Sequence, residues 1–141
     1  MAIVGFSFSK ILVEKKEKAP LKTEIKSKIH ITNISKDDVK LVQGKDVLRF
    51  GFEFGIEYLP NLAKIEFEGH LLLVAEPKEA DEIIKKWKAG NKLDDDIRLR
   101  VYNTIFNKCN VKAFELEEDF NLPLHLRLPQ IAKDAAKEAK K

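Results

Sequence analysis

The feature that most constrains the fold of this chain is a strict alternation of apolar and polar side chains over residues 47–58. Every second residue is apolar, and the positions between carry Arg, Gly or Glu apart from the first, which is Val47. The apolar series is Leu48, Phe50, Phe52, Phe54, Ile56 and Tyr58. A period of two indicates a β-strand with one face toward a core, and this strand is about twice the usual length. The chain must therefore build a long sheet whose aromatic face another layer covers.

A second long strand is predicted over residues 63–73, where every odd position is apolar or glycine. It follows a turn at Leu59, Pro60 and Asn61, because proline lacks the donor that a strand needs and asparagine favours turns. The two strands should pair as an antiparallel hairpin. Near its end, Leu72 and Val74 add apolar groups to the polar face. We expect this stretch to meet something on both faces.

Two further strands are predicted upstream. In residues 25–32, Ile25, Ser27, Ile29 and Ile31 alternate with Lys, His and Thr, and residues 3–17 form the other strand. In the latter, Phe6 and Phe8 share one parity, whereas Ile11 and Val13 share the other. Either a β-bulge re-aims the side chains or both faces are covered. Residues 36–46 are mostly polar, with charged residues at both ends, and are interpreted as a solvated loop.

The period changes to a helical one at Pro77, which suits a first helical turn. Apolar residues at positions 80, 83, 84 and 87 share one helical face, and Gly90 is a plausible C-cap. A longer helix is predicted after residues 94–96, three aspartates that favour N-caps, and it should run to about residue 116. Its apolar positions are Ile97, Val101, Ile105 and Cys109, every fourth residue, beside Ala113. We expect Tyr102 and Phe106 to pack this helix against the sheet.

Residues 120–131 carry two prolines and alternating leucines, so they should form an extended strip on the body of the protein. Residues 132–141, rich in Lys and Ala, are a tail or short helix. Strands followed by helices predict the α+β class, with a four-stranded antiparallel sheet and two helices packed on one side. At 141 residues, we expect a single domain over residues 1–131.

Composition narrows the functional classes. A net charge of +3 is too small for a protein whose main role is to wrap nucleic acid. The longest apolar run, residues 71–75, is far shorter than a membrane span, and no signal peptide is visible. The single cysteine argues against a disulfide-bonded secreted protein, so we expect a cytosolic one. The excess of Lys and Glu over Gln, Cys and Met is typical of thermophiles.

No motif for catalysis or cofactor binding is present. The three histidines lie in different elements, without the local pairs of a metal motif, and the glycines are too scattered to cradle a phosphate. Cys109 is expected to be a buried, inert thiol. The glutamates at positions 53, 57, 66 and 68 are expected to form a solvated sheet face interleaved with Arg49 and Lys64. The sequence therefore predicts no enzyme, no cofactor and no metal.

The remaining indication of function is an excess of apolar side chains, because one sheet and two helices cannot bury all of them. The surplus includes Val4, Phe6, Leu72, Val74 and the leucines of the strip. On a soluble protein such surface marks subunit contacts or a groove for other chains.

The order of elements resembles the SecB family of protein-export chaperones and its archaeal SecB-like relatives. The resemblance rests on a first strand with the sequence FSFSKILV at residues 6–13, a hairpin ending in FEGHLLLV at residues 67–74, and a long helix followed by FNLP at residues 120–123. It implies an ATP-independent holdase that binds unfolded or precursor polypeptides, assembled as dimers or tetramers. The basic C-terminus departs from the bacterial family, which leaves any motor partner in doubt.

The residues expected at a polypeptide groove or a subunit contact are Phe6, Phe8, Leu72, Val74, Leu122, Leu124 and Leu126. Two other hypotheses remain open. One is an adaptor or antitoxin-type partner that binds a single protein through the same surface. The other is a sheet-based nucleic-acid binder, which ranks lowest because helices should cover the aromatic face and the opposite face carries Glu.

Overall fold

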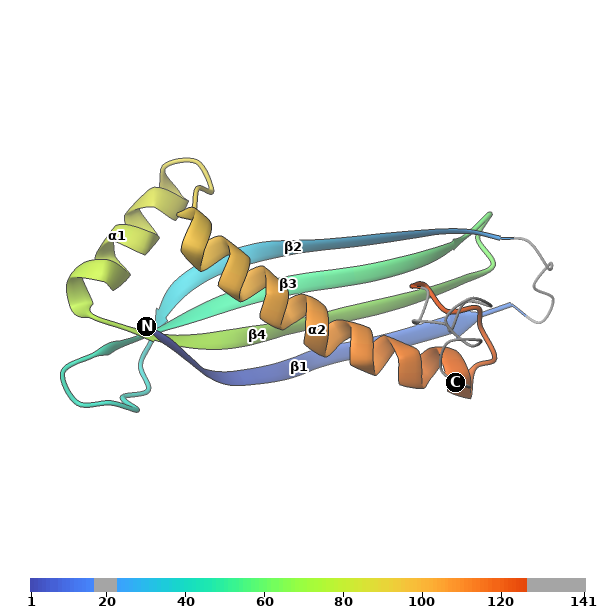
Figure 1. Cartoon of the computed structure of the whole chain (residues 1–141), viewed down its shortest axis with the longest axis horizontal. Coiled ribbons are helices and arrows are strands. Elements are labelled where there is room, and N and C mark those ends of the chain that lie inside the picture. The colour runs from blue at the N-terminus through green and yellow to red at the C-terminus, as the bar shows by residue number, and fades with distance from the viewer. Residues whose placement is uncertain (17–22, 127–141) are drawn as a thin grey trace, which may run out of the picture.

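The structure, a computed structural model, describes residues 1–16 and 23–126 (Figure 1). Four long antiparallel strands form one sheet, and two helices lie on one of its faces. The elements are β1 (Ala2–Lys15), β2 (Glu24–Asp37), β3 (Asp46–Leu59), β4 (Ala63–Ala75), α1 (Pro77–Lys88) and α2 (Asp95–Asp119). The strand order β1-β4-β3-β2 places the predicted hairpin at the centre. The predicted α+β class is confirmed, while residues 127–131 of the strip and the predicted tail lie outside the described residues.

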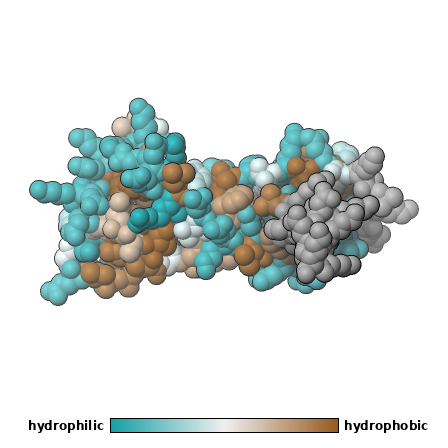
Figure 2. Space-filling model, viewed as in Figure 1, coloured by the Kyte–Doolittle hydropathy of each residue, from teal (hydrophilic) through white to brown (hydrophobic). Residues whose placement is uncertain are grey.

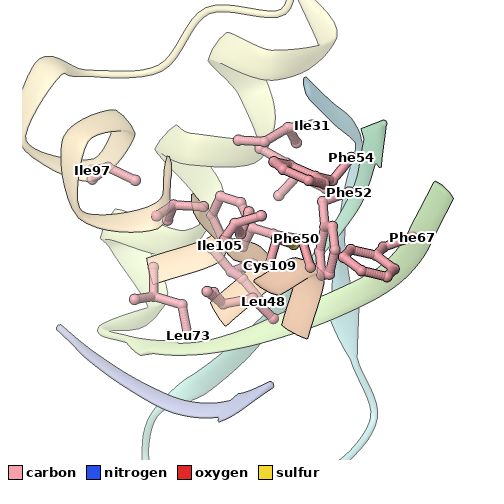
Figure 3. Close-up of a cluster of buried hydrophobic side chains, with 14 of the residues drawn as sticks. Ile31, Leu48, Phe50, Phe52, Phe54, Phe67, Leu73, Ile97, Ile105 and Cys109 are labelled. Carbon is pink, nitrogen blue, oxygen red and sulfur yellow. The ribbon is translucent and has the colours of Figure 1, made fainter. Parts of the chain in front are cut away.

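The face beneath the helices carries the core, as the alternation predicts. All six apolar side chains of the β3 series are at most 2% exposed. Residues directly opposite one another in antiparallel strands point to the same face, so the β4 partners Ile65, Phe67 and Leu71 complete this layer. Figure 3 shows Leu48 and Phe50 of this layer packed against Ile105 and Cys109 of α2.

The change of phase in β1 is caused by β-bulges. Its pairing with β4 shifts register between Ile3 and Gly5 and again between Phe8 and Lys10. These extra residues bring Phe6 and Phe8 onto the same face as Ile11 and Val13, since their β4 partners all belong to the core face. Of the two explanations left open by the sequence, the bulge is confirmed.

The outer face of the sheet, away from the helices, is charged over half of its length. One row of opposed residues alternates in sign across all four strands, from Lys26 through Glu57 and Lys64 to Glu14. The solvated face predicted for the glutamates is confirmed. At the end of the sheet where β1 begins, the same face is apolar, because Leu72 and Val74 of β4 lie beside Val47 of β3. Val47 and Val74 are nonetheless buried, at 2% and 5% exposed.

Helix α2 crosses the strands diagonally (Figure 1) and buries a stripe with a spacing of four residues. The stripe consists of Ile97, Val101, Ile105, Cys109 and Ala113, and it continues to Glu117. Phe106 follows Ile105 by one residue and so points about 100° away. It is 37% exposed, so the prediction that it packs the helix against the sheet is wrong, whereas Tyr102 does pack against the core.

Three further expectations at element ends need correction. Strand β2 extends to Asp37, into the predicted loop, and α2 continues three residues beyond 116. Asp94 is the N-cap residue of α2, but its side chain makes no capping bond. The ammonium of Lys86 in α1 donates to the Asp94 carboxylate at 2.8 Å instead, which ties the two helices together.

Within the described ranges, no helix is long and apolar enough to cross a membrane.

Candidate functional site

A row of aromatic rings crosses the helix-covered face, starting at the edge strand β1. The centroids of Phe6 and Phe8 lie 5.1 Å apart, those of Phe8 and Phe67 5.2 Å, and those of Phe67 and Phe54 5.8 Å. We call these four residues the aromatic row. Phe6 also stacks on the buried Phe52 at 5.1 Å. Such stacked and edge-to-face pairs fix the rings in place.

The aromatic row is buried on the central strands β4 and β3 and partly exposed on the edge strand β1. Phe67 and Phe54 are 1% and 2% exposed, whereas Phe6 and Phe8 are only partly buried. Ile11, on the same face of β1, is 44% exposed. Helix α1 packs mainly on β2 and β3 and α2 mainly on β4, and α2 crosses β1 with its C-terminal half (Figure 1). The open end of the row is therefore an apolar surface along one edge strand.

Gly69 of β4 makes this packing possible. A Cβ atom at Gly69 would lie 2.2 Å from the Ser7 carbonyl oxygen of β1 and 2.8 Å from the Phe52 ring. Both distances are shorter than any real contact of that kind. The absence of a side chain at Gly69 thus lets β1 pair closely and lets Phe52 lie beneath Phe6 and Phe8.

Within residues 1–16 and 23–126, no strand pairs with the outward edge of β1 or of β2. A free edge offers backbone donors and acceptors to another extended chain. The two edges differ in their side chains. On β2 the core-facing residues Ile31 and Ile34 are buried and Ile25 and Ile29 are partly buried, and none of them is aromatic, whereas β1 keeps Phe6, Phe8 and Ile11 accessible. Only the β1 edge combines free backbone groups with open aromatic side chains.

A groove opens between the start of β1 and the first turns of α2. We call it the N-terminal groove; its lining is Met1, Leu73, Asp96, Ile97, Leu99, Arg100 and Val101. Met1 is 49% and Leu99 58% exposed. The guanidinium of Arg100 donates to the Met1 carbonyl oxygen at 2.8 Å and holds the terminus beside α2. Figure 2 shows apolar surface gathered below the helices at this end of the molecule.

A buried polar cluster lies at the opposite end, where the chain leaves α2. The Glu117 side chain is 0% and the His125 side chain 1% exposed, and His125 Nδ1 lies 2.5 Å from Glu117 Oε1. His125 Nε2 lies 2.8 Å from Asn110 Oδ1. The Tyr58 hydroxyl donates toward Glu117 Oε1, at 3.1 Å. Burial, followed by the Glu117 charge, raises the pKa of Tyr58, so its hydroxyl stays a donor.

Sequence reasoning missed this polar cluster. It treated each histidine as isolated, because no His lies at a helical spacing from a potential partner. One available signal was a single His among the leucines of the segment that follows the helix. Asn110 and Glu117, seven residues apart on α2, lie on one helical face and converge on it.

The four candidate residues on the strands divide between the two faces of the sheet. Phe6 and Phe8 lie together at the open end of the aromatic row. Leu72 and Val74 lie on the outer face, where Leu72 is partly buried and Val74 almost fully. Leu72 and Val74 therefore do not share a groove with the aromatic row. A role for them in subunit contact stays a prediction.

The three candidate leucines after α2 also have different environments. Leu122 is 7% exposed and belongs to the core, so it is closed to an external chain. Leu124 and Leu126 are 41% and 38% exposed. The residues that the sequence did not single out are Met1, Leu99 and Ile11. Only their position relative to the helix layer, which tertiary packing decides, distinguishes them from other surface apolar residues.

Cys109 is buried and free, as predicted. Burial raises the pKa of its thiol to about 12. The thiolate, which is the reactive form, is thus suppressed. Within the described part of the chain, no three His, Cys, Asp or Glu side chains gather in a way that could hold a metal ion.

No protein-family model matches the sequence, and no curated protein matches it. Among solved structures, the chain is similar to the SecB-like chaperone of Mycobacterium tuberculosis, solved in complex with a peptide from an antitoxin. The similarity has a TM-score of 0.49 at 15% sequence identity, and it covers 94% of this chain and 91% of that one.

Proposed function

We propose that this protein is a non-enzymatic, ATP-independent chaperone that binds extended apolar segments of unfolded polypeptides along the β1 edge. The observation that carries the proposal is the combination, on one strand, of a free backbone edge with the open end of the aromatic row. Roles in protein export and a cytosolic location stay predictions from the sequence.

The geometry favours an extended client. A strand added beside β1 would pair with its free N–H and C=O groups, whatever the client sequence. Alternate side chains of that strand would point to the helix-covered face and lie near Phe8 and Ile11. Aromatic rings and aliphatic chains bind apolar groups with little sequence preference. Such a surface selects clients for being extended and apolar, which are properties of unfolded chains.

The expected affinity is modest. Covering about 200 Å² of apolar surface contributes about 5 kcal/mol, at about 25 cal/mol per Å², and ordering the peptide offsets part of it. A short segment should therefore bind with a Kd of roughly 1 mM. A longer client that also occupies the N-terminal groove should bind more tightly, because the second contact is intramolecular. Weak individual contacts allow release without a nucleotide.

We further propose that copies of the chain assemble through apolar surfaces of this kind. Leu72 is partly exposed on the outer face, and Val4 in the first bulge of β1 is 44% exposed. Light scattering of the purified protein tests this point. A dimer or tetramer would support assembly, and a monomer at micromolar concentration would refute it.

A matched pair of charge insertions tests the client site. Ile11→Glu places a carboxylate beside the aromatic row, whereas Val111→Glu places one on α2 at a residue that is 60% exposed. Both positions are exposed, so both variants should keep the fold. We expect Ile11→Glu to weaken binding of an unstructured apolar peptide about tenfold and to reduce suppression of client aggregation. Val111→Glu should change neither. Equal effects of the two variants would refute the site.

The partner that the protein captures distinguishes a chaperone from a specific adaptor or antitoxin-type partner. Binding of several unrelated unfolded proteins with similar affinity supports the chaperone. A single folded partner bound at fixed stoichiometry, with no effect on denatured clients, would support the adaptor instead.

A further inference from the structure

Residues 120–126 follow α2 and turn back over the helix-covered face of the sheet (Figure 1). We call this segment the C-terminal strap. Its apolar anchor is Leu122, which is buried in the core. Two polar contacts connect it to the sheet: Lys15 Nζ donates to the Phe120 carbonyl oxygen at 2.7 Å, and the Tyr58 hydroxyl donates to the Pro123 carbonyl oxygen at 2.7 Å.

The strap is held by side chains and not by a strand ladder. The backbone N–H groups of Asn121 and Leu122 bond to carbonyl oxygens of α2 itself, and Pro123 has no N–H. The backbone N–H of His125 donates to the Glu117 carboxylate at 3.2 Å. A segment without ladder bonds can leave the sheet without breaking the pairing of any strand.

The polar cluster is the main attachment beyond Leu122. Oε1 of Glu117 lies near the Tyr58 hydroxyl, whose single proton it shares with the Pro123 carbonyl oxygen, and it accepts from both the ring and the backbone N–H of His125. Oε2 of the same carboxylate is buried and has no hydrogen-bond partner. The ring of His125 is fixed from the other side by Asn110. One carboxylate oxygen thus connects the strap to both α2 and β3.

A buried pair of this kind makes an attachment that is easy to reverse. Desolvation offsets much of the attraction between a buried carboxylate and its partner, and apolar residues of similar volume often stabilise a protein more. When the strap leaves, Glu117 and His125 regain water, including at the unpartnered Oε2. The open and closed states should therefore lie closer in free energy than they would with an apolar contact.

Opening the strap would lengthen the apolar surface of the client site. His125 packs edge-on against Phe54 at 6.3 Å and beside Phe114 at 5.0 Å. Phe54 is the inner end of the aromatic row, whose outer end is formed by Phe6 and Phe8 on β1. Removing the strap would uncover Phe54 and join it to the surface that is already open.

We propose that the C-terminal strap is a displaceable cover of the client site and that Glu117 and His125 hold it closed. Clients compete with the strap for the inner half of the aromatic row. This inference rests on the proposed function, because it assigns a regulator to the same site. It makes the apparent affinity depend on the fraction of molecules whose strap is open.

Two opposite substitutions test the latch. Glu117→Gln removes the charge but keeps the shape, and the matched control is Glu118→Gln at the next, exposed position. We expect backbone amides of the strap to exchange with deuterium about tenfold faster in Glu117→Gln and unchanged in Glu118→Gln. The double variant Glu117→Leu with His125→Leu replaces the pair by apolar groups and should slow this exchange. Circular dichroism identifies any variant that fails to fold. If Glu117→Gln fails to fold, the exchange rate of the strap in the double variant tests the latch instead.

Client affinity is measured on the same proteins with an unstructured apolar peptide. A peptide that binds Glu117→Gln up to tenfold more tightly, and the double variant more weakly, is the expected result. Unchanged exchange in both variants would overturn the latch. Altered exchange with unchanged affinity would overturn the cover but leave the proposed function standing. If the peptide does not bind the wild-type protein at all, the proposed function is refuted. The exchange rates of the strap still test the latch in that case.

Discussion

Replacing Gly69 by Ala should be the most destabilising small change in the sheet, because two neighbours occupy the space that a methyl group needs. The new Cβ atom would lie 2.2 Å from the Ser7 carbonyl oxygen and 2.8 Å from the Phe52 ring. Ordinary contacts need about 3.5 Å, so β1 must move from β4 by about 1 Å and Phe52 must also shift from its buried position. The first change weakens two backbone hydrogen bonds, worth about 1 kcal/mol each, and the second overpacks the core at about 1 to 3 kcal/mol.

The expected loss for Gly69→Ala is therefore about 3 to 5 kcal/mol of unfolding free energy. Gly55→Ala is a matched control on β3, because its Cβ would meet the flexible Lys28 side chain at 3.4 Å and the Ile65 carbonyl oxygen at an ordinary contact distance of 3.9 Å. An alanine within a strand orders more easily than glycine, so this control should change stability by about 1 kcal/mol or less. Urea unfolding followed by circular dichroism measures both. A difference below about 1 kcal/mol between the variants would refute the packing argument at β1.

Three further predictions concern α2. Ile105→Ala should lower the unfolding free energy by about 2 to 4 kcal/mol because Ile105 is fully buried, whereas Phe106→Ala should change it by less than about 1 kcal/mol; equal losses in urea unfolding would contradict the assigned face. Cys109 should resist a thiol reagent at pH 8 until the protein unfolds, because burial raises its pKa to about 12; rapid labelling of the native protein would contradict this. Since the unfolded thiol ionises first, stability should be intact below about pH 8.5 and fall as pH rises toward 12; Cys109→Ala should show a shallower fall.

Much of the fold follows from local periodicity. The alternation over residues 47–58 predicts β3, its aromatic face and, with the break at Pro60, the hairpin to β4. The every-fourth apolar series predicts α2 and the burial of Cys109. These signals work because strand and helix geometry repeat at fixed intervals, so burial on one face leaves a regular pattern.

The site is less visible in the sequence. Phe6 and Phe8 could be selected as strand aromatics, but their exposure depends on where α2 crosses the sheet. Val74 has the same local pattern as exposed apolar residues, yet it is buried beside Val47. Such differences arise from packing between distant segments, which local periodicity does not record.

The polar cluster illustrates the same limit. Tyr58, Asn110, Glu117 and His125 come from three segments, and no spacing rule relates the strand to the strap. A charged residue at the last step of an apolar helical stripe is the clue, because Glu117 continues the series of Ile97 to Ala113. A buried carboxylate requires partners, so this break in the stripe indicates a contact with a polar side chain elsewhere.

The central claim is that extended apolar polypeptides bind along the β1 edge, and cross-linking with identification of the attached residue tests it most directly. An unstructured apolar peptide carrying a photoreactive side chain is irradiated with the protein, and the attachment sites are mapped by mass spectrometry. The account predicts attachment along β1, at Phe6, Phe8 and Ile11, with further sites at Leu99 in the N-terminal groove. Attachment confined to the charged outer face, around Glu57 and Lys64, would contradict it.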